Sequence, residues 1–114
     1  SHGQPLIGVP VFSDGQGSPI SALSPLQTVK VKVQFNNSTA QEYPVHLAVV
    51  LYDAEDKLQQ IKTVSDAFAM GRSDDIELDM VLKATVSSGY YLKAFLWDTS
   101  GSLKPYIDSN VFPQ

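Results

Sequence analysis

Twelve aspartate and glutamate residues are the side chains of this sequence with the greatest potential for acid–base chemistry. Hydrolysis of a glycosidic bond needs two carboxyl groups that face one cleft, and nucleophilic catalysis needs a nucleophile beside a base. The acidic clusters Asp74-Asp75 and Glu77 with Asp79 instead fall in turns or at alternating positions of predicted strands. Such positions are typically solvated, so the sequence predicts a protein that is not an enzyme.

Residues that bind metals are sparse. The chain has no cysteine and two histidines, His2 and His46, which excludes thiolate sites and the common zinc sites. Calcium prefers clustered oxygen ligands. Five aspartates fall in predicted loops: Asp14, Asp53, Asp56, Asp98 and Asp108. Their spacing matches no known calcium loop, and aspartate commonly caps turns by bonding its own backbone; we predict no cofactor and no metal site, with a structural calcium ion as the open alternative.

Aromatic side chains in the segment 91–97 are the clearest candidates for ligand binding. Successive strand residues point to opposite faces, so Lys93 shares a face with Tyr91, Phe95 and Trp97. Lysine rarely lies in a core. We therefore expect this face to be the outer one.

A second predicted strand, residues 45–53, adds to the same surface. Alternation puts His46, Ala48, Val50 and Tyr52 on its outer side, and in immunoglobulin-type sandwiches these two strands are neighbours in one sheet. The candidate ligand-binding residues are therefore Trp97, Phe95, Tyr52, Tyr91 and His46.

This aromatic patch has three interpretations. Large exposed apolar patches usually mark interfaces, so the one we favour is that a neighbouring domain or the N-terminal segment covers it. Aromatic faces also stack on sugar rings, whose C–H bonds meet the negative π face. The first, structural interpretation also includes the case in which Trp97 turns inward as a core residue. In the third interpretation the strand phase is wrong.

Short alternating segments dominate the rest of the chain. Residues 28–35 alternate apolar and polar residues strictly, 45–52 are apolar on both faces, and 76–82 alternate again; these patterns are typical of strands. Segment 90–97 is rich in aromatic residues, and 103–112 can supply a last strand. Turn residues separate these segments.

The segment 56–70 is ambiguous. Leu58, Ile61, Val64 or Ser65, and Phe68 have near-helical spacing, and Gly71 follows them as a helix stop signal. The surrounding strands favour a hairpin partner for residues 45–52 instead. We predict a strand from 58 to 64.

Composition and charge narrow the class of protein. The chain has 114 residues, 43% of them hydrophobic, and a formal net charge of -4, which suits one folded domain. Its eight lysines and arginines are never adjacent, so no clustered positive charge is available for nucleic acid or a membrane surface. No apolar run is long enough to insert in a membrane.

The predicted organisation is one domain after a short leading segment. Residues 1–19 are rich in Gly, Pro, Ser and Gln and are expected to be a linker or an edge strand, with Ser1-His2-Gly3 resembling a cloning remnant. Residues 20–114 are expected to form a single domain. Its recurring short strands predict an all-β, two-sheet sandwich of about seven strands, immunoglobulin-like or fibronectin type III-like.

Three short motifs resemble a known family. Segment 91–98 reads YLKAFLWD and 103–105 reads LKP, similar to the "KAFLWD…MKPL" ending of immunoglobulin-like modules in large secreted proteins of Firmicutes. Residues 51–53 and 57–58 resemble the family's "LYD…GKL" hairpin, and Asn36-Asn37 resembles its turn after the second strand. The resemblance covers roughly residues 28–112. The chain departs from the pattern at Glu55-Asp56, where glycine is common, and at Leu103, where methionine is usual.

The resemblance implies an extracellular location, secreted or attached to the cell surface, and no catalytic residue. Such modules accompany glycoside hydrolases, polysaccharide lyases and cell-wall anchors. The expected function is therefore that of a structural or interaction module whose partners are neighbouring domains of the same polypeptide. A carbohydrate-binding module that uses the aromatic patch on a polysaccharide is the alternative.

Overall fold

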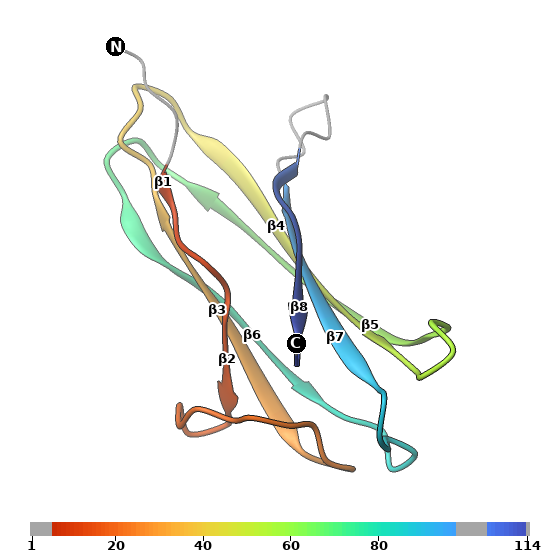
Figure 1. Ribbon diagram of the computed structural model, residues 1–114. Helices are drawn as coiled ribbons and strands as arrows, with labels where there is room; N and C mark the ends of the chain where they lie inside the picture. Colours follow the sequence, from red (N-terminus) through yellow and green to blue (C-terminus); the bar gives the residue numbers. More distant parts are fainter. Residues whose placement is uncertain (1–5, 98–104, 114) are drawn as a thin grey trace.

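Two antiparallel β-sheets packed face to face make up the protein (Figure 1). A computed structural model describes residues 6–97 and 105–113, and for residues 105–110 the backbone alone. This part of the chain contains eight strands and no helix, so it holds no helix that could cross a membrane.

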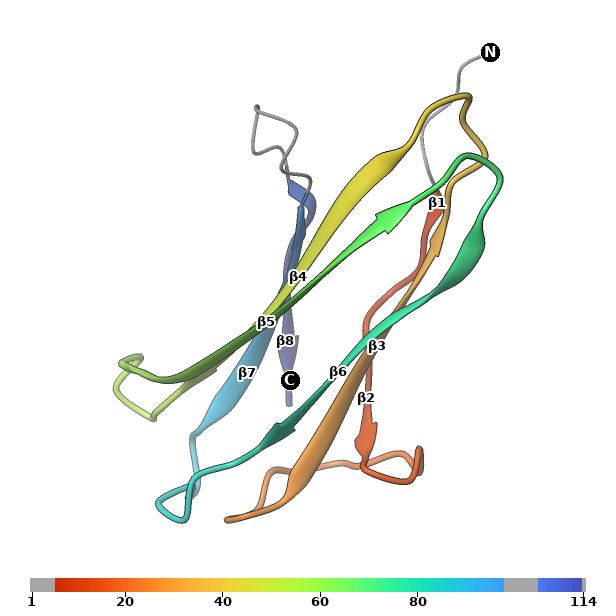
Figure 2. The same cartoon turned by 180° about the vertical axis from the view of Figure 1, so that it is seen from behind.

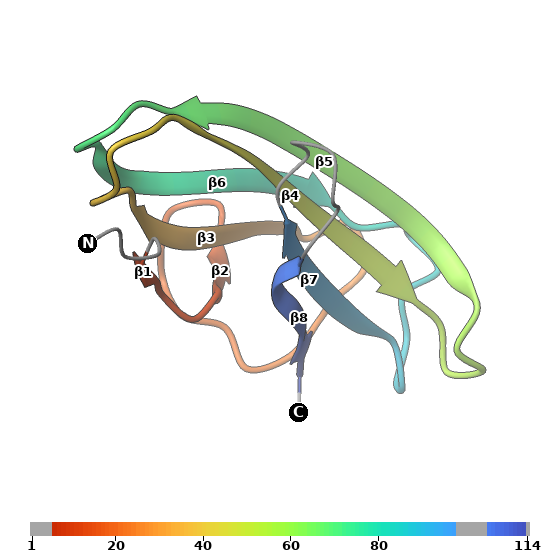
Figure 3. The same ribbon diagram turned by 90° about the horizontal axis from the view of Figure 1, so that it is seen from above.

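The first sheet, sheet A, is built around β3 (Thr28–Asn36). One edge of β3 pairs along its whole length with β6 (Ser73–Val81). The other edge pairs with β1 (Leu6–Ile7) near one end and with β2 (Val11–Asp14) near the other. Figure 3 shows β1 and β2 on the same side of β3, away from β6. Together they act as one interrupted edge strand.

The second sheet, sheet B, has the strand order β5-β4-β7-β8. Its members are β4 (Tyr43–Tyr52), β5 (Leu58–Phe68), β7 (Tyr91–Trp97) and β8 (Pro105–Phe112). The central strands β4 and β7 are therefore neighbours, as the sequence predicted.

The topology is that of an immunoglobulin-like or fibronectin type III-like sandwich, which confirms the predicted fold class. With β1 and β2 taken as one strand, seven strand positions remain. The strand after β4 stays in the sheet of β4 and β7, the place of strand C′ in immunoglobulin nomenclature.

The core forms where the inner faces of the two sheets meet. Alternate residues of β3, from Val29 to Phe35, are fully buried, and so are Leu92, Ala94 and Leu96 of β7. Burying each such branched or aromatic side chain contributes roughly 1.5–3 kcal/mol. At the open side of the sandwich, the ring of Phe12 stacks on Phe112 with centroids 4.9 Å apart and bridges the sheets.

The ambiguous segment 56–70 contains a strand and no helix, as predicted. β5 pairs with β4 from Leu58 to Phe68, and a register shift at Leu51/Tyr52 accommodates the preceding turn. Gly71, at φ +84°, lies in the turn to β6 and does not end a helix. The strand is longer than the predicted 58–64.

Candidate functional site

The outer surface of sheet B carries the aromatic side chains. Along β7 every second residue, from Leu92 to Leu96, is buried in the core, whereas Tyr91, Phe95 and Trp97 are half-buried on the other face. This alternation confirms the predicted strand phase. It also excludes the interpretation in which Trp97 turns into the core.

Strand pairing brings the predicted site residues together. The register sets His46 opposite Trp97 and Tyr52 opposite Tyr91. The His46 and Trp97 rings are 5.9 Å apart at 16°, and the Tyr52 and Tyr91 rings are 5.1 Å apart at 18°. Phe95 lies between these two stacked pairs. We call the surface of His46, Tyr52, Tyr91, Phe95 and Trp97, together with Lys93, the aromatic face.

The rings of the aromatic face cover an apolar floor. Ala48 and Val50 point to the same side of β4 as His46 and Tyr52, yet they are only 2% and 4% exposed. In the register, Ala48 lies opposite Phe95 and Val50 lies opposite Lys93, so larger side chains flank both small residues. The face is thus a packed layer of its own, with the rings half in contact with water.

Neighbouring elements orient the two ends of this layer. At one end, Nδ1 of His46 lies 2.7 Å from Oγ of Ser65, which is opposite it on β5. At the other end, the Tyr91 hydroxyl donates to Oδ1 of Asp56 at 2.6 Å. This hydrogen bond raises the pKa of Tyr91 to about 12, with further contributions from burial and the negative charge.

The turn between β4 and β5 holds Asp56 in place. Asp56 adopts φ +65°, the left-handed conformation for which glycine is the usual residue. The buried carboxylate of Asp53 accepts N–H bonds from Glu55 and Lys57 and a side-chain bond from Gln59. These bonds lower the pKa of Asp53, those from the backbone of Lys57 and Glu55 first. The departure from glycine noted in the sequence therefore supplies a partner for Tyr91.

Lys93 lies in the middle of the aromatic face. Its Nζ is 5.5 Å from the centroid of the Tyr52 ring, a cation–π contact. Within residues 6–97 and 105–113, as far as side chains are described, no carboxylate oxygen lies within 4.0 Å of this ammonium group. Lys30 and Arg72, by contrast, each pair with two carboxylates.

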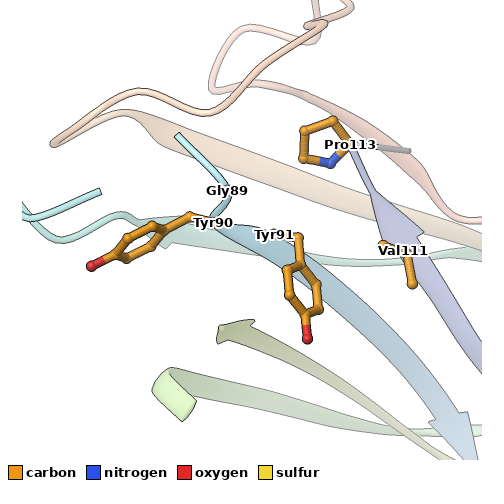
Figure 4. A pocket seen from close by; sticks show the side chains of 5 residues that line it. All are labelled: Gly89, Tyr90, Tyr91, Val111 and Pro113. Carbon is orange, nitrogen blue, oxygen red and sulfur yellow. The ribbon is translucent and has the colours of Figure 1, made fainter. Parts of the chain in front are cut away.

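An open pocket of about 420 Å³ adjoins the Tyr91 end of the face. Figure 4 shows Tyr90 and Tyr91 on one side of it and Val111 and Pro113 on the other. Gly89 completes the lining; at φ +93°, a Cβ there would lie 2.7 Å from that of Ala54. Among the described residues, this lining offers no ionisable group apart from the two phenols, so the pocket extends an apolar surface.

Two of the five candidate calcium ligands, Asp14 and Asp53, cap turns. Asp14 accepts N–H bonds from Gln16 and Ser18, which lower its pKa, and Asp53 caps its turn in the same way. The prediction that all five candidates lie in loops is wrong for Asp14, the last residue of β2, and for Asp108, which lies within β8. Asp98 lies outside the described residues, as do Ser1-His2-Gly3. Among the described side chains, no group of three His, Cys, Asp or Glu residues could hold a metal.

Comparison with known proteins adds no function. No family model matches the sequence, and no curated protein matches it either.

The sequence predicted the aromatic side chains of this surface, but not the contacts that hold them in place. The Asp56–Tyr91 bond depends on the conformation of a turn, and the contribution of Val111 and Pro113 depends on the pairing of β7 with β8. The only sequence signal for the first was a missing turn glycine at Glu55-Asp56.

Proposed function

We propose that this protein is a non-catalytic interaction module of a secreted multidomain protein, and that the aromatic face is its contact surface. The observation that carries the proposal is the contrast between the two outer surfaces. Sheet A turns Lys30, Lys32, Glu77 and Asp79 to water, whereas sheet B turns aromatic rings outward. A module with no contact to make has no need of an aromatic outer layer, and apolar surface of this kind usually marks an interface.

The partner that fits this proposal is a neighbouring domain of the same polypeptide. The motifs that resemble immunoglobulin-like modules of secreted Firmicutes proteins support an accessory role of this type, next to domains that act on polysaccharide or on the cell wall. In that role the module spaces and orients catalytic or anchoring domains.

Hydroxyl-radical footprinting tests the proposal directly. We expect Trp97, Phe95 and Tyr52 to be oxidised more slowly in the longer polypeptide that includes the adjacent domains than in the isolated chain. Met70, which is 66% exposed and lies in the turn between β5 and β6, serves as the reference. Equal oxidation of the aromatic face in both proteins would rule out domain docking on this surface.

A second candidate function is binding of a saccharide by the same face. Two observations favour it: the apolar floor of Ala48 and Val50 is already covered by the protein's own side chains, and the rings above it remain half-exposed. A covering domain is therefore not required for the stability of this sheet. Rings that are rigidly held and wet suit reversible stacking on sugar faces.

The substitution Trp97→Ala tests whether the Trp97 ring binds a saccharide or only supports the fold. Since Trp97 is not part of the core, we expect this variant to fold with an unchanged far-UV circular dichroism spectrum and to lose saccharide binding. Saccharide binding that survives the substitution would remove Trp97 from the site.

A further inference from the structure

We infer that the aromatic face recognises an acidic saccharide: one carboxylate of the ligand pairs with Lys93 while Tyr91, Phe95 and Trp97 stack on the adjoining sugar faces. This inference rests on the second candidate function, the binding of a saccharide by this surface. It adds the chemical class of the ligand and the residue that selects it.

The position of Lys93 is the first observation. It lies between Tyr91 and Phe95 on the outer side of β7, about 7 Å from each because alternate strand residues are two rises apart. Val50 lies opposite it on β4 and Val111 opposite it on β8. A single ammonium group is thus framed by rings and aliphatic side chains.

The electrostatic surroundings are the second observation. Among the described residues of β4, β5 and β7 that share this outer face, Lys93 is the one lysine, arginine, aspartate or glutamate. Its described partner is the Tyr52 ring, which leaves the donors of the ammonium group without a carboxylate. A ligand carboxylate would supply the charge-assisted bond that the protein does not.

Two cations elsewhere on the protein have the carboxylate partners that Lys93 lacks. Lys30 on sheet A is 3.1 Å from Glu77, and Arg72 is 3.1 Å from both Asp66 and Asp74. Both are on or beside strands that carry matching acids. Lys32, Lys57, Lys62 and Lys83 likewise have no described carboxylate oxygen within 4.0 Å. What sets Lys93 apart from these lysines is its place among aromatic rings on the outer face of sheet B.

A saccharide fits this cation better than an apolar protein surface does. Close cover by an apolar domain would remove water from the lysine without replacing it, which is unfavourable for a charge. Sugar hydroxyls and the water between them keep the ammonium group hydrated while the C–H faces contact the rings.

The net charge of the chain limits how acidic the ligand is. At a formal net charge of -4, a densely charged polyanion is repelled, whereas one carboxylate opposite one lysine is attracted at short range. The expected ligand is therefore a mostly neutral glycan that carries an isolated uronic acid.

Fluorescence titration of Trp97, the single tryptophan of the chain, provides the test. The probes are a xylo-oligosaccharide that carries one glucuronic acid, and the same compound with its carboxylate reduced to an alcohol. We expect the acidic compound to bind roughly 10-fold more tightly than the reduced one, in line with one charge-assisted pair. Added salt should narrow this difference.

Substitutions at Lys93 test whether this residue causes the preference for the acidic compound. Lys93→Met should bring the two affinities together, Lys93→Arg should keep them apart, and Lys32→Met, on the outer face of sheet A, should change neither. Circular dichroism of each variant checks folding, and NMR shifts of the Ala48 and Val50 methyl groups report binding independently of fluorescence.

The outcomes separate the two levels of the proposal. Equal binding of both compounds by the unmodified protein would overturn the acidic preference and leave saccharide binding in place. No binding of either compound, by fluorescence and by methyl shifts, would overturn saccharide binding together with this inference and leave the face to a protein partner.

Discussion

Asn37 is the residue on which the geometry of one end of the sandwich most depends. It is fully buried at the end of β3, and its side-chain amide donates to the carbonyl oxygens of Gln41, Phe68 and Ala69. Its Oδ1 accepts from the N–H and the hydroxyl of Thr39. One side chain therefore joins the β3–β4 loop to the turn between β5 and β6, across the two sheets.

We predict that Asn37→Ala lowers the free energy of unfolding by roughly 2–4 kcal/mol, because several buried hydrogen-bonding groups lose their partner at once. Asn37→Asp should be worse, since a carboxylate would face three carbonyl oxygens. Urea unfolding measures both effects. Ser38→Ala, at the exposed neighbouring position, is the matched control; if the Asn37 and Ser38 variants were equally stable, the network would not hold this end together.

At the level of the strands, the edge strands β5 and β6 show how the sandwich protects an open edge. Figure 2 shows these two strands on one side of the molecule, one from each sheet. Gln60 of β5 donates to the carbonyl of Val81 at 3.0 Å and accepts the N–H of Lys83 at 2.9 Å. Lys62 donates to the carbonyl of Asp79. These side chains occupy backbone groups that would otherwise be free to pair with another strand.

We predict that Gln60→Ala selectively exposes this edge. The Lys83 amide should exchange with deuterium roughly 5-fold faster or more, because it loses a bond worth about 1 kcal/mol. The variant should also aggregate more readily through the uncovered edge of β6. Thr63→Ala, an exposed position on the outer face of the same strand, is the control, and unchanged protection at Lys83 in Gln60→Ala would contradict the capping role.

Strand β5 also shows why one sequence pattern was ambiguous. β3 was predictable because it is central to sheet A and buries one face, which produces strict alternation. β5 is an edge strand: Ile61 is 58% exposed on the outer face, whereas Phe68 is fully buried in the core. Apolar residues on both faces gave the near-helical spacing. The pairing with β4, which fixes β5 as a strand, is a long-range contact that local spacing does not encode.

For the molecule as a whole, the sequence predicted which residues share the aromatic face, but not how they are held. Alternation and the neighbouring places of two strands were sufficient to group Tyr52, Phe95 and Trp97. The stacking of His46 on Trp97, the Asp56–Tyr91 bond and the covered floor depend on register and side-chain rotamers. Those emerge only when both sheets are assembled.

The response of the whole sandwich to acid follows from three aspartates: Asp14 and Asp53, which cap turns, and Asp74 in β6. Backbone N–H bonds lower the pKa values of Asp14, Asp53 and Asp74 from an ordinary value of 3.8, and for Asp74 the neighbouring Arg72 lowers it further. The folded state therefore prefers these carboxylates ionised. Their contribution to stability is complete above the ordinary pKa and is lost as the pH falls through the lower folded values.

We predict that the urea midpoint stays nearly constant from neutral pH down to about pH 5 and then falls steadily toward pH 2. Asp53→Asn, in the turn that positions Asp56, should be less stable than the unmodified protein at neutral pH, and this difference should shrink in acid, where the wild-type carboxylate is also protonated. Asp75→Asn, at an exposed position of β6, should leave the profile almost unchanged. A midpoint that rises on acidification, or an Asp53→Asn deficit that is the same at both ends of the range, would show that these ionised caps do not set the acid stability of the sandwich.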